Sequence, residues 1–377
     1  MELKEFLSII AVKKIVIFGT GSASRQIGSL IPYNVTYYVD NDSNKWDLEF
    51  LNSRIFPPEV LTKEDPDNLA IIIMSMFYPE IANQLKKLGF SEEKHFWNGL
   101  DLLPDDQTTI LNEVTLEYPV ESSPRYGYGK PAHQKIQAII NRERKRYQGI
   151  LKKFARYQSF FDNIPLFAME FNSPEPYWNN EFIPGLDAIS IYAFLALNNP
   201  DRYFEIGSGN STKFARRAIK EQGLRTKITS FDPFPRREVD GLCDRIIREP
   251  LEKVDLTVFA ELQKGDILFV DNSHRSSMNT DVTVVFLDIL PYLKKGVLVG
   301  FHDIFLPYDY PPDWAKRFYS EQYLLASAIL AQGKKFRIEL ANHFITKDLE
   351  LKQLLIPIWD KSREALLGGA AFWIKTL

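Results

Sequence analysis

The N-terminal part of the chain alternates short apolar runs with segments of helical periodicity. Apolar, β-branched runs occupy residues 14–18, 35–39 and 70–74, and apolar positions recur at helical spacing over residues 78–88. Strands that alternate with helices are typical of an open α/β sheet, because each helix returns the chain to the same end of the sheet. We therefore expect residues 1–106 to form a small open α/β domain.

The pattern changes between residues 107 and 185. No period persists over residues 108–126, and a helical run then extends over about residues 133–161. One face of this run is apolar and the other is basic, with Arg142, Arg144, Lys145, Arg146, Lys152, Lys153 and Arg156. Such a face is either simply solvated or binds an acidic partner. We interpret residues 107–185 as a linker followed by a basic helical connector.

The C-terminal part resumes the alternation of strands and helices. Five apolar runs are expected as parallel strands, at residues 202–206, 227–231, 245–248, 266–270 and 297–301. Helical periodicity is present at residues 188–197, 280–293 and 321–330. The last two strands, at residues 336–345 and 371–376, are expected as an antiparallel pair at the sheet edge. Residues 186–377 are therefore predicted to form an α/β domain with a seven-stranded, mostly parallel sheet.

Composition narrows the class of protein. The chain has 377 residues, of which 45% are apolar and 25% charged, and its formal net charge is -3. The length favours two domains, and the near-neutral charge argues against a nucleic-acid-binding protein, whose phosphate contacts usually leave a basic excess. The single cysteine, Cys243, favours a reducing compartment, because it cannot form an intramolecular disulfide. No run has the length of a membrane helix or the pattern of a signal peptide, so we expect a cytoplasmic protein.

A glycine-rich turn follows the first strand. Gly19, Gly21 and Ser22 lie between this strand and a predicted helix, and Asp40 ends the second strand. This order is expected of a dinucleotide-binding βαβ unit, in which the acidic residue accepts hydrogen bonds from ribose hydroxyls. The pattern therefore indicates a candidate nucleotide site, with NAD among its possible ligands.

The same N-terminal residues carry a resemblance to known proteins. Residues 17–23 and 39–46 resemble the small Rossmann-like domains attached to some sugar-modifying acetyltransferases and methyltransferases. The resemblance implies a nucleotide or nucleotide-sugar site, with Gly19, Gly21 and Ser22 near phosphate. An equally open alternative to this ligand site is that the domain has kept the fold and lost the ligand, or that it serves as a subunit contact in a homo-oligomer.

A second glycine turn and a series of polar residues mark the carboxyl ends of the C-terminal strands. Glu205 ends the first of these strands, and Gly207, Ser208 and Gly209 follow it. Polar residues end three later strands, with Asp232, then Asp271, Asn272, Ser273 and His274, then His302 and Asp303. In an open parallel sheet these strand ends face one crevice, where ligands bind. The sequence therefore predicts a ligand site at this edge of the sheet.

In this order the motifs resemble those of class I S-adenosylmethionine-dependent methyltransferases. The match covers about residue 186 to the C-terminus and is most similar to a bacterial small-molecule subgroup with Asp-x-Ser-His and His-Asp motifs. The resemblance implies S-adenosylmethionine as the methyl donor, with Glu205 near its amino group, Asp232 on its ribose hydroxyls and Glu249 near its adenine. The implied donor site comprises Glu205, Gly207, Ser208, Gly209, Ser211, Asp232, Glu249 and Asp271.

Methyl transfer to oxygen requires an acceptor that loses a proton and lies in line with the sulfonium methyl group. His274 and His302 are the candidate bases, and Asp271 is a further candidate catalytic residue. Alternatively, Asp271 and Asp303 hold a magnesium-like cation that orients acceptor oxygens. The expected acceptor is a small polar molecule, such as a sugar-containing compound or a secondary metabolite. The alternative function is that of an NAD- or nucleotide-sugar-binding oxidoreductase, or of a non-catalytic sensor.

Overall fold

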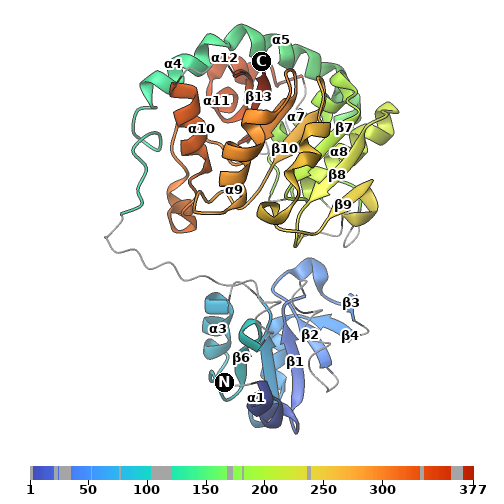
Figure 1. Ribbon diagram of the computed structural model, residues 1–377. Helices are drawn as coiled ribbons and strands as arrows, with labels where there is room; N and C mark the ends of the chain where they lie inside the picture. The colour runs from blue at the N-terminus through green and yellow to red at the C-terminus, as the bar shows by residue number, and fades with distance from the viewer. Residues whose placement is uncertain are drawn as a thin grey trace. The chain divides into compact units, whose positions relative to one another are not determined.

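The computed structural model describes residues 3–20, 24, 35–51, 53–75, 78–102, 121–167, 173–180, 182–235, 239–331, 335–357 and 368–377. The chain divides into two compact units, Met1–Pro119 and Val120–Leu377, which are described one at a time (Figure 1). None of the described helices combines the length and the apolar character that crossing a bilayer requires.

The N-terminal unit is built on a sheet with the strand order β3-β4-β2-β1-β5-β6. The strands are β1 (Lys14–Phe18), β2 (Val35–Val39), β3 (Glu49–Phe50), β4 (Ser53–Phe56), β5 (Leu69–Ile73) and β6 (Phe96–Asn98), and the helices are α1 (Leu3–Ile10) and α3 (Tyr78–Lys87). Because β1 pairs in parallel with β2 and β5, the expected α/β order is confirmed. The helix expected after the first glycine turn lies outside the described residues.

The C-terminal unit contains a seven-stranded sheet with the order β12-β13-β11-β10-β7-β8-β9. Its strands are β7 (Arg202–Ile206), β8 (Lys227–Phe231), β9 (Arg245–Ile247), β10 (Ile267–Val270), β11 (Leu298–Phe301), β12 (Phe336–Ala341) and β13 (Phe372–Thr376). The first five strands are parallel, whereas β13 is antiparallel to β11 and β12. The predicted fold class is confirmed. Every residue of β10 is buried, as expected for a central strand covered on both faces.

One predicted strand is too long. The apolar run over residues 336–345 leaves the sheet after Ala341, and helix α11 (Asn342–Lys347) begins there. The reason lies in Asn342, whose side-chain amide is buried and donates to Asp187 Oδ1 (2.7 Å) and Ser190 Oγ (3.0 Å). These hydrogen bonds hold the chain against helix α7 (Gly185–Asn198), where a continued strand would leave a buried amide without partners.

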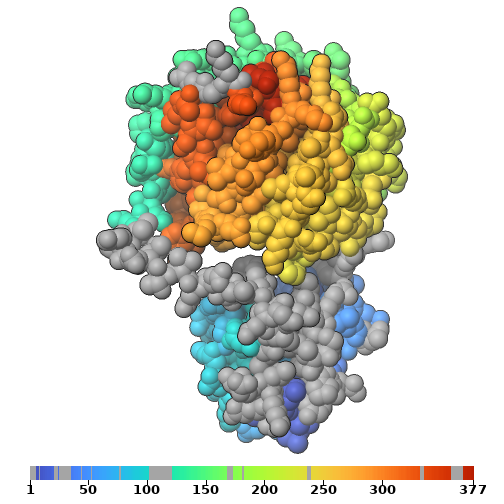
Figure 2. Space-filling view, viewed as in Figure 1, coloured from blue at the N-terminus to red at the C-terminus, as the bar shows by residue number. Residues whose placement is uncertain are grey.

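The other helices of the C-terminal unit are α4 (Gln134–Arg142), α5 (Arg144–Phe154), α6 (Gln158–Asp162), α8 (Asn210–Gln222), α9 (Asp281–Val284), α10 (Glu321–Leu330) and α12 (Leu349–Gln353). The helical run expected over residues 133–161 is therefore interrupted. Several of its apolar side chains, including Tyr147 and Phe154, are fully buried in the main core of this unit, so the basic segment packs as part of it. Figure 2 shows α4 and α5, in green, with side chains that project from the outer edge of the unit. Arg142, Lys145, Lys152, Lys153 and Arg156 are exposed.

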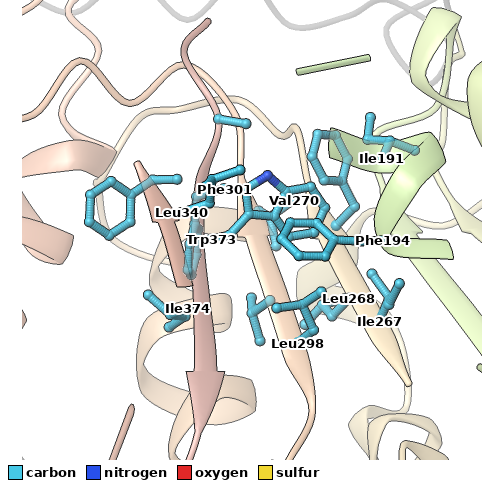
Figure 3. Close-up of a cluster of buried hydrophobic side chains, with 14 of the residues drawn as sticks. Ile191, Phe194, Ile267, Leu268, Val270, Leu298, Phe301, Leu340, Trp373 and Ile374 are labelled. Atoms are coloured by element: carbon cyan, nitrogen blue, oxygen red, sulfur yellow. The ribbon is translucent and has the colours of Figure 1, made fainter. Parts of the chain in front are cut away.

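The hydrophobic core of the C-terminal unit holds β10 and β11 in place, and the ends of these strands carry the candidate site. Trp373 of β13 is fully buried, and its ring lies over Gly300 of β11, where a Cβ atom would be 2.7 Å from the indole. The ring centroid of Phe194, from helix α7, lies 4.8 Å from that of Trp373. Figure 3 shows this contact among the aliphatic side chains of β10 and β11. The strand ends that follow β10 and β11 therefore start from a packed and well-defined layer.

Candidate active site

The turn between β7 and α8 forms the first wall of the site. Gly207 has φ of 79°, a left-handed conformation that favours glycine, and a Cβ atom there would lie 1.8 Å from the backbone oxygen of Asp271. Gly209 is extended, with φ of 175°, and a Cβ atom there would meet no described atom within 4 Å. The turn thus requires glycine at position 207 for packing against the end of β10, and it leaves open space at position 209.

Asp232 ties the end of β8 to this turn. Its Oδ2 accepts a hydrogen bond from the Ser208 N–H (2.8 Å), and its Oδ1 accepts one from the Phe234 N–H (2.9 Å). The hydroxyls of Ser208 and Ser230 lie 2.6 Å apart. Because the carboxylate is only half-buried, it has an edge toward solvent at the same end of the sheet as the glycine turn. The predicted donor residues Gly207, Ser208, Gly209 and Asp232 are therefore brought together.

Two further predicted donor residues differ in their surroundings. Ser211 is buried in the first turn of α8, and Glu249 is exposed just after β9. Sequence reasoning missed Arg248, whose guanidinium donates to the Asp232 carbonyl (2.9 Å) and to Ser230 Oγ (3.2 Å). The sequence did contain a signal for Arg248, because this residue comes directly after β9, the strand that pairs with β8. Arg248 thereby fixes the backbone on which Asp232 is mounted.

Glu205 lies behind the turn, away from solvent. It is fully buried, and its carboxyl accepts hydrogen bonds from the hydroxyls of Tyr203 (3.0 Å) and Thr212. Burial raises the pKa of Glu205 to about 7, although the hydroxyls that donate to it act in the opposite direction. The carboxyl therefore links β7 to the first turn of α8, and it holds a proton more readily than an exposed glutamate does.

This raised pKa predicts how stability depends on pH. The folded protein binds the Glu205 proton more tightly than the unfolded chain, so the stabilisation is complete below a pH of about 4.5 and is lost as the pH rises through about 7. Glu205→Gln has no ionisable group, so it should become more stable relative to the unchanged protein as the pH rises from 5 to 8.5, by on the order of 3 kcal/mol. Urea unfolding of both proteins across this range measures the difference. A difference that does not change with pH would show that Glu205 is ionised throughout.

The ends of β10 and β11 form the second wall. Oδ1 of Asp271 lies 3.2 Å from His274 Nε2 and 3.2 Å from His302 Nδ1. The two oxygens of Asp303 face the same nitrogens, with Oδ2 3.3 Å from His274 Nε2 and Oδ1 3.4 Å from His302 Nδ1. His274 and Asp303 have left-handed backbones, with φ of 57° and 54°. Such conformations are uncommon for residues other than glycine and cluster at functional sites.

Sequence reasoning missed two carboxylates that complete this cluster. Glu321, in the first turn of α10, has Oε2 2.8 Å from His274 Nδ1, and Asp187, in the first turn of α7, has Oδ2 3.4 Å from His302 Nε2. Both side chains are fully buried. The sequence contained a signal for both Glu321 and Asp187. Each is an acidic residue at the start of a very apolar helix, and such a residue needs a partner once it is buried.

The cluster holds more carboxylates than imidazoles. Burial alone would lower the pKa of His274 and of His302, but the adjacent carboxylates raise both well above the ordinary value. Burial alone would raise the pKa of Asp271, but the two imidazoles hold it well below its usual range. Burial raises the pKa of Asp303 and of Glu321. The carboxylates around the two imidazoles therefore outweigh burial in setting the pKa of each histidine.

An aromatic wall borders the cluster. The ring of Tyr319 lies 4.7 Å from that of His274, and the ring of Trp314 lies 5.6 Å from that of Tyr319. The guanidinium of Arg317 is stacked 4.0 Å over Trp314, and that of Arg275 lies 5.5 Å over Tyr319. A flat or sugar-like group can stack on such rings.

The candidate site of the N-terminal unit is described in part. Gly21 and Ser22 lie outside the described residues, whereas Gly19 follows β1 with φ of 106° and Asp40 follows β2. The Asp40 carboxylate already accepts hydrogen bonds from Thr20 Oγ1 (2.5 Å) and Lys45 Nζ (2.9 Å). A ribose would have to compete with these partners, and a nucleotide ligand stays a prediction for this unit.

Comparison with known sequence families finds one match in each unit. Residues 204–304 match the family described as "Methyltransferase domain", and residues 11–96 match the family described as "C2185-like, N-terminal". The match in the C-terminal unit is to a methyltransferase family, and it confirms the resemblance that the motifs predicted. A comparison with curated proteins finds no match.

Several solved structures are similar to parts of the chain. The methyltransferase PaMTH1 of Podospora anserina, crystallised with S-adenosylhomocysteine, is 15% identical; the match covers 67% of this chain and 100% of that one, with a TM-score of 0.33. The O-methyltransferase TomG of Streptomyces achromogenes, crystallised with S-adenosylmethionine, is 15% identical over 60% of this chain and 89% of that one, with a TM-score of 0.28.

A Rex-family repressor, RSP, is 17% identical over 27% of this chain, with a TM-score of 0.21. The match spans about half the length of that repressor, 54%. With TM-scores this low, none of the three similarities bears on what this chain binds.

Proposed function

We propose that the C-terminal unit transfers a methyl group from S-adenosylmethionine to an oxygen of a small polar acceptor. The acceptor oxygen attacks the methyl carbon, the carbon–sulfur bond breaks, and S-adenosylhomocysteine leaves with the electron pair. The acceptor hydroxyl loses its proton in the process. The site must therefore hold the donor, align the acceptor and make the acceptor oxygen nucleophilic.

One observation carries the donor site: the glycine turn and the half-buried Asp232 carboxylate share the edge of the sheet where the strand ends converge. The space at Gly209 suits a ligand that approaches the backbone closely, and the Asp232 carboxylate suits a ribose diol. Glu205 acts from behind the turn in this proposal, and Ser211 and Glu249 border the donor. The methyltransferase domain found over residues 204–304 supports this assignment.

The acceptor lies between the donor and the cluster of Asp271, His274, His302 and Asp303. The aromatic wall of Tyr319 and Trp314 favours an acceptor with a sugar ring or a flat ring. A general base must lose its own proton near neutral pH, and the raised pKa of His274 and of His302 disfavours that role in the protein alone. The two histidines are better suited to hold another group that activates the acceptor.

Calorimetric titration of the full-length protein with S-adenosylmethionine tests the proposal. We expect binding with one site per chain, and Asp232→Ala should weaken it by at least about 10-fold, because two charge-assisted hydrogen bonds to the ribose are lost. Asp288→Ala, which changes an exposed aspartate, is the matched control and should bind as the unchanged protein does. If the unchanged protein binds no donor, or if both variants bind it equally, the assignment of the donor site is wrong.

A further inference from the structure

We propose that Arg275 and Arg317 bind an acidic group of the acceptor, so that the acceptor is a sugar or flat-ring compound that carries a carboxylate or a phosphate. The guanidiniums of these two arginines lie 5.5 and 5.6 Å from the centre of the Tyr319 ring. That ring lies 4.7 Å from the ring of His274 at the strand ends. Each guanidinium is therefore two ring contacts away from His274, a span that one sugar or aromatic ring with an acidic substituent can bridge.

The two guanidiniums retain hydrogen-bond donors for a ligand. Most arginines that the structure describes form an ion pair with a carboxylate, as Arg216 does with Asp244 (2.6 Å). Within the described part of the chain, neither Arg275 nor Arg317 forms such a pair. The one hydrogen bond described for either guanidinium runs from Arg275 Nε to the Arg317 carbonyl (3.0 Å). The terminal nitrogens of both side chains can therefore donate the paired N–H groups with which arginine binds a carboxylate or a phosphate.

The surrounding structure holds the two guanidiniums in a defined place. Arg317 is stacked 4.0 Å over Trp314, whose own ring packs against Phe305 at 5.2 Å. The N–H of Ser320 donates to the His274 carbonyl (2.8 Å), and this bond fastens the segment before α10 to the segment after β10. The two arginines lie on these two segments. A guanidinium that is stacked on an aromatic ring and weakly hydrated loses little when it binds an anion, so the pair is suited to this role.

The charges around the site set the orientation of such an acceptor. Asp271, Asp303 and Glu321 place carboxyl groups around His274, and these groups repel an acidic group of the acceptor. A hydroxyl can approach them, whereas a carboxylate or a phosphate is attracted to the two arginines. The hydroxyl to be methylated therefore points toward the strand ends, and the acidic group lies beside the Tyr319 ring. This orientation rests on the methyl-transfer function proposed above.

Calorimetric titration of the full-length protein with pairs of ligands tests this inference. The pairs are glucuronate and its methyl ester, para-hydroxybenzoate and its methyl ester, and phenyl phosphate and phenol. In at least one pair the acid should bind at least ~10-fold more tightly than its neutral partner. The first two pairs separate a sugar ring from a flat ring, and the last two separate a carboxylate from a phosphate. Each titration is made with and without S-adenosylhomocysteine, so the result does not depend on a bound donor product.

Substitutions of the arginines assign the preference to this site. Arg275→Gln and Arg317→Gln should each reduce the preference for the acid by ~3–10-fold, and the double variant should remove it. Lys316→Gln, which changes an exposed cation beside Arg317, is the matched control and should keep the preference. Both arginines are exposed, so these variants should fold as the unchanged protein does.

The outcomes separate this inference from the proposed function. A preference for the acid that disappears in the double variant supports the arginine site, and it does so even if S-adenosylmethionine does not bind, a result that would overturn methyl transfer. Equal binding within every pair, or no binding of any acid, overturns the arginine site. A preference that survives the double variant, or that Lys316→Gln removes equally well, overturns it too. In each of these cases, binding of S-adenosylmethionine would leave the methyl-transfer function intact.

Discussion

Replacing Gly207 with alanine is expected to lower the free energy of unfolding of the C-terminal unit by about 4 kcal/mol. The new Cβ atom would lie 1.8 Å from the backbone oxygen of Asp271, and this oxygen belongs to the chain directly after β10. No side-chain rotation relieves a contact with backbone, so either the glycine turn or the end of β10 must move. Both movements change the position of the glycine turn relative to the end of β10. Scanning calorimetry of the full-length protein should show a melting transition lowered by about 10 °C.

Gly223 provides the matched control for this substitution. It ends α8 with φ of 58°, and a Cβ atom there would meet no described atom within 4 Å. Gly223→Ala therefore changes only the backbone preference, at a cost of about 1 kcal/mol. The difference between the two variants isolates the contact with Asp271. Equal losses in both would mean that the turn does not pack against the end of β10.

Much of the fold was predictable because its strands are continuous apolar runs with polar ends. The runs before Glu205, Asp232 and Asp271 each gave a strand of the parallel sheet, and the order of these ends predicted one shared edge. The error at β12 had a local cause. The residues after Ala341 are apolar enough for a strand, but the buried Asn342 amide bonds to a helix that is distant in the sequence.

The chemistry of the cluster was less predictable than its position. Asp271, His274, His302 and Asp303 were predicted because they end neighbouring strands. Of their outer partners, Asp187 lies 115 residues from His302 and Glu321 lies 47 residues from His274, and no local sequence pattern relates either acid to its histidine. Pairing a buried acid with its partner requires the three-dimensional packing, which the sequence alone does not supply.

Asp187 should be among the most sensitive residues of the C-terminal unit. Its carboxylate accepts hydrogen bonds from Asn342 Nδ2 (2.7 Å) and from the N–H groups of Ala370 (2.7 Å) and Ala371 (2.9 Å), besides its contact with His302. Asp187→Ala leaves the two buried N–H groups of Ala370 and Ala371 without this acceptor, and each unsatisfied donor costs about 1–3 kcal/mol. We expect the free energy of unfolding to fall by about 4 kcal/mol or more, as measured by urea denaturation. Asp313→Ala changes an exposed aspartate in the first turn of another helix and should stay within about 0.5 kcal/mol of the unchanged protein. A loss that is just as small for Asp187→Ala would mean that water replaces the carboxylate, and that neither β13 nor the orientation of His302 depends on it.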